Sequence, residues 1–148
     1  MTNRQKIWDY RFLELARQVS TWSKDPSTQV GAVIVDQQRR VISLGYNGFP
    51  RGVEDSPKLY LHKPSKYKMI VHAEANAILN ATQSLEGATL YSTLFTCCEC
   101  AKLVIQSGIK RVVSYQHLHS EKQHWEESFA VAREMYLQAG VQVYELPL

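Results

Sequence analysis

The chain of 148 residues contains only three cysteines, and all of them fall within four consecutive positions. A disulfide framework spreads its cysteines along the chain, so the lack of cysteine elsewhere excludes a small disulfide-rich fold. The cluster of Cys97, Cys98 and Cys100 indicates metal or redox chemistry instead.

Long hydrophobic runs are also missing, and none approaches the roughly 20 residues that span a bilayer. The first residues, Met-Thr-Asn-Arg-Gln-Lys, lead into an amphipathic pattern and lack a signal-peptide core. We therefore expect a cytoplasmic protein with no membrane partner.

Positive charge is neither abundant nor clustered. The net charge is +3, and basic residues alternate with acids, so no basic track for a nucleic acid is expected. The apolar share of 45% and the charged share of 21% are typical of a folded domain. The length predicts one domain over residues 1–148.

Hydrophobic periodicity and turn residues predict helices and strands along the whole chain. The predicted helices cover about 7–22, 72–83, 98–107 and 120–139, and the predicted strands 29–36, 41–47, 88–95, 110–116 and 141–146. Because strand and helix alternate from residue 71 onward, a parallel sheet covered by helices is expected there. Residues 48–70 are rich in glycine, proline and polar residues and predict a long functional loop.

A metal site is predicted from three residues that each stand where a helix begins. Catalytic zinc takes three nitrogen or sulfur ligands and keeps a fourth position for water, and His72, Cys97 and Cys100 supply that set. A helix N-terminus stabilises thiolate, which favours both cysteines as ligands. Cys98, between them, should point away.

Glu74 stands two residues after His72. Positions i and i+2 do not share a face of a regular helix, so both reach one site only if His72 lies at the very edge of the helix. Glu74 would then lie beside the water at the metal without binding the metal, as a general acid and base.

Other interpretations remain open on these residues alone. The H-x-E pattern also suits a simple helix start, and C-x-x-C also suits a redox pair or half of a structural zinc site. A structural site needs a fourth ligand, for which His117 and His119 are the candidates, although both also suit a surface or pocket position. The two motifs in this order, each opening a helix, favour the catalytic site.

The motifs His72-Ala73-Glu74 and Thr96-Cys97-Cys98-Glu99-Cys100 resemble the signature of the zinc-dependent cytidine deaminase superfamily, H-x-E followed by P-C-x-x-C. Four blocks narrow the resemblance to the deoxycytidylate (dCMP) deaminase family: SKDPSTQVGAVIVD, GYNGFPRGVED, KYKMIVHAEANAIL and CAKLVIQSGIKRVV. The resemblance extends from about residue 8 to 143. It implies a three-layer α/β/α sandwich with a five-stranded mixed sheet.

Thr96 departs from the pattern, because the family has proline there. Proline would stiffen the approach to the first cysteine, so its loss affects the rigidity of the loop and removes no ligand. The sequence has no spare cysteines for a second zinc such as some viral members carry. One Zn²⁺ per chain is therefore expected.

The resemblance implies hydrolytic deamination of dCMP to dUMP and ammonia, which supplies dUMP for thymidylate synthesis. Glu74 would take a proton from water, deliver it to N3 of cytosine and help ammonia leave. The implied substrate-binding residues are Ser23, Lys24, Val30, Asn47, Ala73 and Tyr115. Most of them also have a plain interpretation, such as a turn residue for Asn47, a helix-end charge for Lys24 and a core position for Val30.

Family members are commonly hexamers that are activated by dCTP and inhibited by dTTP, with Mg²⁺ a candidate companion of the nucleoside triphosphate. The resemblance implies that the regulator binds near the GYNGFPRGVED loop. The implied positions are Phe49, Arg51, Gly52, Glu54, Lys63 and Tyr67. The alternatives to a dCMP deaminase are another zinc nucleoside or nucleobase deaminase, including one acting on adenosine in transfer RNA, and a non-catalytic nucleotide-binding zinc module.

Overall fold

The computed structural model describes residues 1–116 and 123–148, except for the side chains of residues 123 and 124. Its described strands form one sheet in the order β2-β1-β3-β4-β5. The strands are β1 (Gly31–Val35), β2 (Val41–Tyr46), β3 (Thr89–Ser92), β4 (Arg111–Tyr115) and β5 (Gln142–Leu146). Strand β1 is antiparallel to β2 and β3, whereas β3, β4 and β5 are parallel. The expected mixed five-stranded sheet is confirmed.

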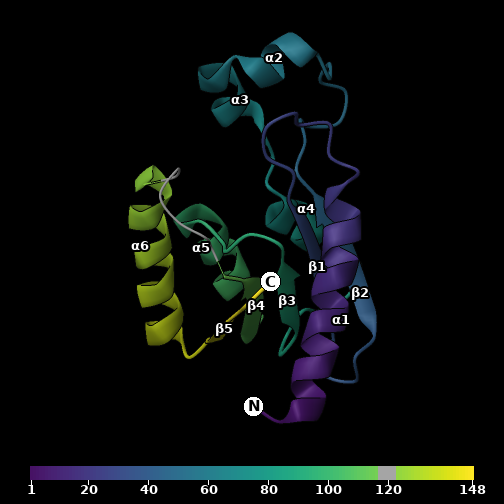
Figure 1. Ribbon diagram of the computed structural model, residues 1–148, viewed down its shortest axis with the longest axis vertical. Helices are drawn as coiled ribbons and strands as arrows, with labels where there is room; N and C mark the ends of the chain where they lie inside the picture. Colours follow the sequence, from purple (N-terminus) through teal and green to yellow (C-terminus); the bar gives the residue numbers. More distant parts are fainter. Residues whose placement is uncertain (117–122) are drawn as a thin grey trace.

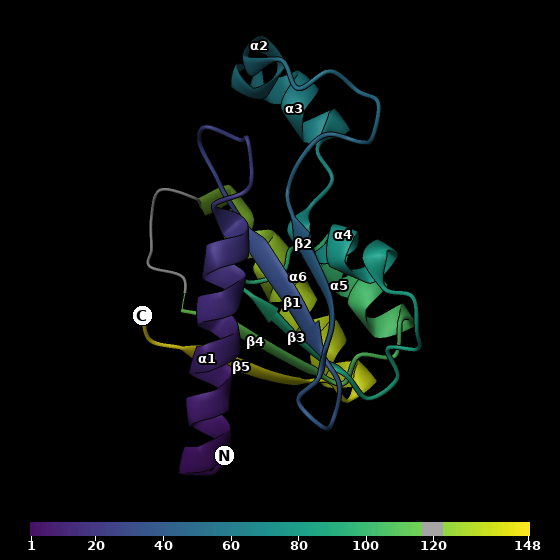
Figure 2. The ribbon, with the colours of Figure 1, turned by 90° about the vertical axis from the view of Figure 1, so that its right-hand side faces the viewer.

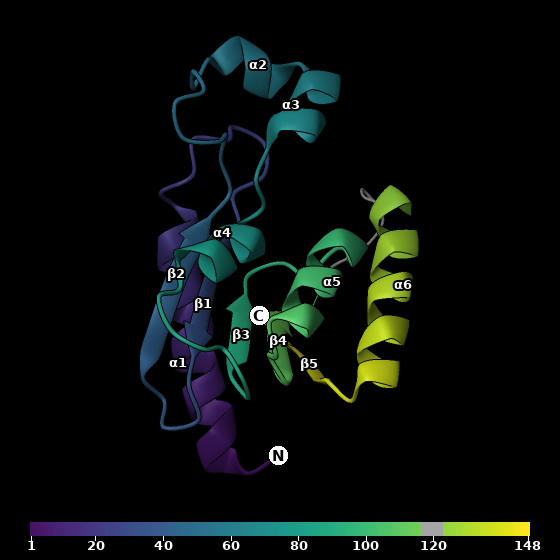
Figure 3. The ribbon, with the colours of Figure 1, turned by 180° about the vertical axis from the view of Figure 1, so that it is seen from behind.

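Helices cover both faces of the sheet. Helix α1 (Asn3–Ser20) lies on one face, and α4 (Ala73–Asn80), α5 (Cys98–Gln106) and α6 (Gln123–Ala139) lie on the other (Figures 1 and 2). Seen from behind, α5 and α6 run beside each other (Figure 3). This is the predicted three-layer sandwich.

The alternating side chains of β1 divide the core into two clusters. Ala32 and Ile34 pack with α4, α5 and α6, whereas Val33 and Val35 pack with α1. Successive side chains of a strand point to opposite faces, so a strand buried on both faces reads as a continuous apolar run. All residues of β1 are buried, as its sequence GAVIV requires.

Two glycines allow helices to approach the sheet closely. A Cβ atom added to Gly31 would collide with the backbone oxygen of Ala16 on α1, and one added to Gly45 would collide with the backbone of Ala77 on α4. Because the obstacles are backbone atoms, no side-chain movement would relieve them. The glycines of β1 and β2 therefore set the thickness of both helix–sheet layers.

The first helix begins as the sequence predicts and ends earlier. Thr2 is the N-cap, and its hydroxyl accepts a hydrogen bond from the backbone N–H of Gln5 at 3.1 Å. The helix ends at Ser20, before the predicted end near Ser23. Backbone N–H groups of residues 21 to 23 bond to carbonyls three residues earlier, so the chain continues as turns before Pro26.

The prediction of one long loop over residues 48–70 is wrong in part. The segment contains α2 (Pro57–Leu61) and α3 (Lys63–Met69), which lie beyond the end of the sheet, apart from the three layers (Figure 1). Both helices have proline in the first turn, where its missing N–H costs nothing. Proline in the first turn favours a helix start, whereas proline farther along the chain breaks a helix.

The remaining elements follow their predictions to within a few residues, and α4 ends at Asn80 rather than near residue 83. Helix α6 is described from Gln123, so its predicted start at residue 120 lies outside the described residues. No helix in the described ranges is long and apolar enough to span a bilayer.

Candidate active site

The three predicted ligands lie at the N-terminal ends of two helices on the same face of the sheet. His72 is the N-cap of α4 and Cys97 is the N-cap of α5, both with extended backbone (ψ of 153° and 168°). Cys100 follows one turn into α5. The N-cap position of His72 is the helix edge that its spacing from Glu74 requires. Two short loops thus bring residues 25 positions apart together.

The side chains of His72, Cys97 and Cys100 converge on one point. Nδ1 of His72 lies 3.4 Å from Sγ of Cys97 and 3.3 Å from Sγ of Cys100, and all ligand atoms lie within 4.8 Å of one another. Tetrahedral zinc with ordinary bond lengths places its nitrogen and sulfur ligands about 3.5 Å apart. The set therefore fits zinc with three protein ligands and one open position.

The ionisation of the ligand group centres on the thiol of Cys97. The hydrogen bond from Cys100, with that from His72, lowers the pKa of the Cys97 thiol to about 4, and the neighbouring sulfur and burial raise the pKa of Cys100. The hydrogen bond to Cys97 raises the pKa of His72. Metal binding would displace the protons of His72 and Cys100, because zinc is held by neutral imidazole and by thiolate. Within the described residues no other group of three such side chains meets this spacing.

Glu74 lies beside the ligand group and is buried, with 4% of its surface exposed. Burial raises the pKa of its carboxyl group, because the charged form is poorly solvated there. The hydroxyl of Ser92 on β3 lies 3.3 Å from Oε1 and orients the carboxyl group. Glu74 is not a member of the ligand group. It therefore lies where an acid and base can act on a water at the metal.

A cavity of about 260 Å³ opens over this group. Its size is close to the lower end of small-molecule sites, about 300 Å³. The residues that line it are Asp25, Ser27, Thr28, Val30, Asn47, Lys63, Lys66, Tyr67, Ile70, His72, Ala73, Glu74, Leu94, Phe95, Cys97 and Trp125. One end thus carries the ligands and Glu74, and α3 contributes cations and an aromatic ring to the wall.

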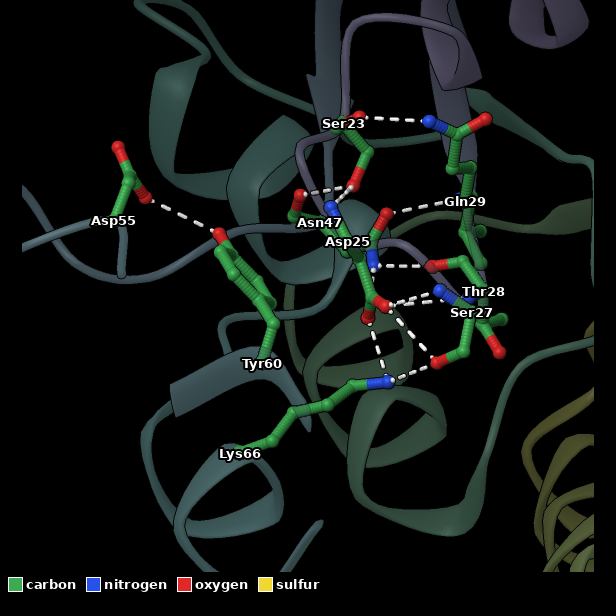
Figure 4. Close-up of polar contacts among 10 residues, drawn as sticks. Ser23, Asp25, Ser27, Thr28, Gln29, Asn47, Asp55, Tyr60 and Lys66 are labelled. Carbon is green, nitrogen blue, oxygen red and sulfur yellow. Dashed lines mark hydrogen bonds and ion pairs between the residues drawn. The ribbon is translucent and has the colours of Figure 1, made fainter. Parts of the chain in front are cut away.

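A buried ion pair forms part of the cavity wall (Figure 4). Nζ of Lys66 on α3 lies 2.7 Å from Oδ2 of Asp25 and donates to Oγ of Ser27 at 2.9 Å. Oδ1 of Asp25 accepts from the backbone N–H groups of Ser27 and Thr28. Burial alone would raise the pKa of Asp25, but Lys66 and these bonds together hold it below its usual value. The carboxylate is therefore charged and anchors α3.

Asn47 is a predicted substrate contact whose side chain is already engaged. Its Oδ1 accepts from the backbone N–H of Val30 at 2.9 Å, and its Nδ2 donates to the carbonyl of Thr28 at 2.8 Å, with Asp25 at 3.4 Å (Figure 4). One lone pair of Oδ1 is left after these bonds. Asn47 lines the cavity, but it also holds the turn before β1 in place.

Of the other predicted substrate residues, Val30 and Ala73 line the cavity, whereas Ser23, Lys24 and Tyr115 do not. Ser23 is buried, and its hydroxyl donates a hydrogen bond to the backbone carbonyl of Asn47. It therefore holds a residue of the cavity wall without lining the cavity itself. Lys24 extends away to form an exposed ion pair with Asp55. The hydroxyl of Tyr115 donates to Glu14 on α1, on the opposite face of the sheet.

The predicted regulatory positions separate into two groups. Lys63 and Tyr67 line the cavity itself. The ring of Phe49 stacks on Tyr60 of α2 with centroids 4.0 Å apart, beside the loop that carries the exposed Arg51, Gly52 and Glu54. Gly52 has φ of +82°, which a residue with a side chain rarely adopts. Lys63 and Tyr67 therefore lie in the cavity wall, and Phe49 lies against α2.

Several cavity residues were missed from the sequence. The cavity is also lined by residues that the sequence does not predict as site residues: Asp25, Ser27, Thr28, Lys66, Ile70, Leu94, Phe95 and Trp125. The Asp-Pro-Ser-Thr turn was a usable signal, because aspartate accepts bonds from the N–H groups that follow it. The sequence does not indicate Lys66 as a site residue, because residues 48–70 are predicted as a loop and Lys66 lies on a helix within them. His117 and His119, the candidate fourth ligands, lie outside the described residues.

A three-layer α/β/α fold with histidine and cysteine ligands at two helix N-termini, and a buried glutamate beside them, defines a zinc-dependent deaminase type of protein. The family model for the cytidine and deoxycytidylate deaminase zinc-binding region matches residues 6–116. The chain belongs to this family, as the resemblance of its motifs implies.

Curated relatives match along most of the chain. An uncharacterised deaminase in the luxG 3′ region of Aliivibrio fischeri is 45% identical over 141 residues, which cover 95% of each chain. The deoxycytidylate deaminase of Mus musculus is 39% identical over 140 residues, 90% of this chain and 76% of the mouse protein.

The fold has a counterpart among solved structures. The dCMP deaminase of cyanophage S-TIM5, crystallised in complex with dCMP and dUMP, has a TM-score of 0.72 with 23% identity and covers 99% of both chains. At this identity the likeness establishes the fold alone. It confirms the architecture over the whole length.

Proposed function

We propose that this protein hydrolyses dCMP to dUMP and ammonia. The observation that carries the proposal is the position of buried Glu74 beside a three-ligand zinc-type group at the end of a cavity of about 260 Å³. The names of the curated deoxycytidylate deaminases to which the chain is 39% identical or more support the choice of substrate. The product dUMP would supply thymidylate synthesis.

One zinc ion per chain, held by His72, Cys97 and Cys100, would lower the pKa of a water at its open position toward about 7. Glu74 accepts the proton of this water and passes it to N3 of cytosine. The water oxygen forms the new bond to C4 and keeps its second proton as a C4 hydroxyl. Glu74 then takes this hydroxyl proton and passes it to N4, so that the C4–N4 bond breaks, ammonia leaves and the C4 carbonyl of dUMP forms. Low exposure of Glu74 keeps solvent from competing for these protons.

The cavity orients the nucleotide with its base at Glu74 and its sugar toward α3. Val30 packs against the base, and Ala73 lies next to the ligand group in the cavity wall. The remaining lone pair of Asn47 Oδ1 accepts a hydrogen bond from a sugar hydroxyl. Trp125 and Phe95 close the opposite wall.

The phosphate lies at the α3 end, because the cations among the described cavity residues are there. Lys66 is neutralised by Asp25, whereas Lys63 forms no ion pair with the described residues and supplies the net positive charge. Lys24 and Ser23, which the family resemblance implies as substrate contacts, are engaged elsewhere, Lys24 with Asp55 and Ser23 with the carbonyl of Asn47. Lys63 is therefore the first position to change.

Regulation by dCTP and dTTP and assembly into a hexamer are further parts of the proposal, carried by the family resemblance. Phe49, Arg51, Gly52 and Glu54, with Lys63 or Tyr67, are the positions for a regulatory nucleoside triphosphate with Mg²⁺. The exposed loop that carries Arg51 adjoins the stacked pair of Phe49 and Tyr60, which offers an aromatic surface beside a basic side chain. The cytoplasm is the proposed location.

Ammonia release from dCMP and from deoxycytidine, measured side by side with zinc-loaded protein, tests the proposal. We expect turnover of dCMP and little turnover of deoxycytidine, because the cations on α3 attract the phosphate that only dCMP carries. Preference for deoxycytidine would keep the deaminase chemistry and overturn the nucleotide substrate. Turnover of neither would contradict the proposal as a whole.

A further inference from the structure

Helix α6 contacts the loop that carries the first cysteine ligand at successive points. The loop residues Phe95, Thr96 and Cys98 each meet a side chain of this helix. Neither α6 nor Thr96 belongs to the ligand group or to the acid–base chemistry. These contacts connect the residues around the Cys97 ligand to α6.

The hydroxyl groups of Thr96 and Tyr136 lie 2.7 Å apart in the core. Both residues are fully buried, with 0% of their surface exposed. A buried hydroxyl without a partner is costly, so each of these two groups depends on the other. Thr96 directly precedes Cys97, and this bond therefore fixes the backbone at the point where it delivers a ligand.

A second hydrogen bond holds the other side of the ligand. The backbone N–H of Cys98 donates to Oγ of Ser128 on α6 at 2.8 Å. The first N–H groups of a helix have no partner within the helix, and here α6 supplies one from outside. Cys97 thus lies between two residues that are both bonded to α6.

Aromatic packing completes the attachment. The ring of Phe95 meets the rings of Phe129 and Tyr136 edge to face, with centroids 5.5 and 6.2 Å apart. The guanidinium group of Arg133 lies 4.6 Å from the centre of the Phe95 ring. The residue two positions before Cys97 is therefore held by the same helix face.

From these contacts we infer that α6 holds the Cys97 loop in the position that zinc binding requires. The hydrogen bond between Thr96 and Tyr136 is the contact that chiefly fixes the orientation of this loop. Zinc tolerates only about 0.2 Å of error in its bond lengths, so freedom in this loop weakens binding. The hydrogen bond restrains the approach to Cys97 in a chain that has no proline there. Thr96 and Tyr136 are positioning residues, and neither touches the metal.

The test compares zinc loss from Thr96→Val, Tyr136→Phe and the double variant. Zinc-loaded proteins are mixed with an excess of chelating indicator, and the rate of zinc release is followed by absorbance. Each single variant should release zinc between about twofold and tenfold faster than the parent, as expected for one buried neutral hydrogen bond. The double variant should release it no faster than the faster single variant, because one shared bond is lost.

Tyr115→Phe is the matched control. It removes a tyrosine hydroxyl that bonds to Glu14 on the other face of the sheet, away from the ligand loop. We expect it to lower the melting temperature without changing zinc release. If Tyr136→Phe and Thr96→Val also lower the melting temperature and leave zinc release unchanged, the bond is only structural and the inference is overturned.

Additive effects of Thr96→Val and Tyr136→Phe on zinc release would also overturn the inference, because two independent contacts would then be at work. Should Thr96→Val fail to fold, Tyr136→Phe and Ser128→Ala, both on α6, are each compared with the parent, and each should release zinc faster because each removes a different bond to the residues that flank Cys97. The inference rests on the proposed zinc site but not on the substrate. A protein that keeps zinc and ignores dCMP would contradict the proposed function and leave this test intact.

Discussion

Nζ of Lys66 lies 2.7 Å from Oδ2 of Asp25, and the two side chains are 7% and 0% exposed. The pair joins α3, which stands apart from the three layers, to the turn after α1 (Figure 4). Taking two charges out of water is costly, so a buried pair is weak evidence for stability by itself. Its place in the cavity wall indicates that it holds α3 over the site.

Replacing Lys66 with methionine should lower the free energy of unfolding by about 3–5 kcal/mol, because the buried Asp25 loses its partner. The double change Lys66→Met with Asp25→Asn should recover most of this loss. Urea unfolding measures both. Lys68→Met, an exposed position of the same helix, is the control and should change little. A Lys66→Met protein as stable as the parent would refute the buried pair.

Lys63 should govern preference for the phosphorylated substrate. Changing Lys63 to methionine should lower kcat/KM for dCMP about fivefold, since an exposed ionic contact contributes up to about 1 kcal/mol. Turnover of deoxycytidine, which has no phosphate, should stay the same. Lys68→Met, on the same helix but not in the cavity wall, should change neither value. An equal loss for both substrates would show that Lys63 does not read the phosphate.

Asp9 on α1 should make the free energy of unfolding depend on pH in the acid range. Burial alone would raise the pKa of Asp9, but hydrogen bonds from Arg111, Tyr91 and Gln5 together hold it below 3.8. A lowered folded pKa gives stability that is present above the unfolded value and lost as the pH falls through the folded value. The free energy of unfolding should therefore drop below about pH 4.

The variant Asp9→Asn tests this origin of the acid dependence. It should be less stable at pH 7, because Arg111 loses the carboxylate charge that it now binds through two hydrogen bonds. It should also lose less stability than the parent between about pH 5 and pH 2, since one titrating carboxyl is gone. Denaturant unfolding across this range gives the slopes. Equal slopes would place the acid dependence in other carboxyl groups.

The ligand end of the site could be predicted from the sequence because its signals are local. His72 and Glu74, and likewise Cys97 and Cys100, stand in short motifs at helix starts. The chemistry of the side chains fixes what they can bind. The parallel part of the sheet, β3 to β5, could also be predicted, because the alternation of strand and helix along the chain is a local signal.

The outer wall could not be predicted, because it depends on contacts between distant residues. Lys66 meets Asp25 only after the segment from Pro57 onward folds as two helices, and proline had been read as a loop signal. Lys24, implied as a substrate contact, pairs with Asp55, which stands 31 positions later in the sequence. Asn47, implied as a substrate contact, also bonds to backbone groups of Val30 and Thr28, and its own short motif does not reveal these bonds.

The central claim is that Glu74 carries the protons of a zinc-dependent deamination, and Glu74→Gln tests it most directly. We predict that the variant keeps about one zinc per chain while ammonia release from dCMP falls at least about a hundredfold. Glu99→Gln, an exposed acid in the first turn of α5, is the control and should keep both zinc and activity. Zinc-loaded Glu74→Gln protein with the activity of the parent would contradict the account.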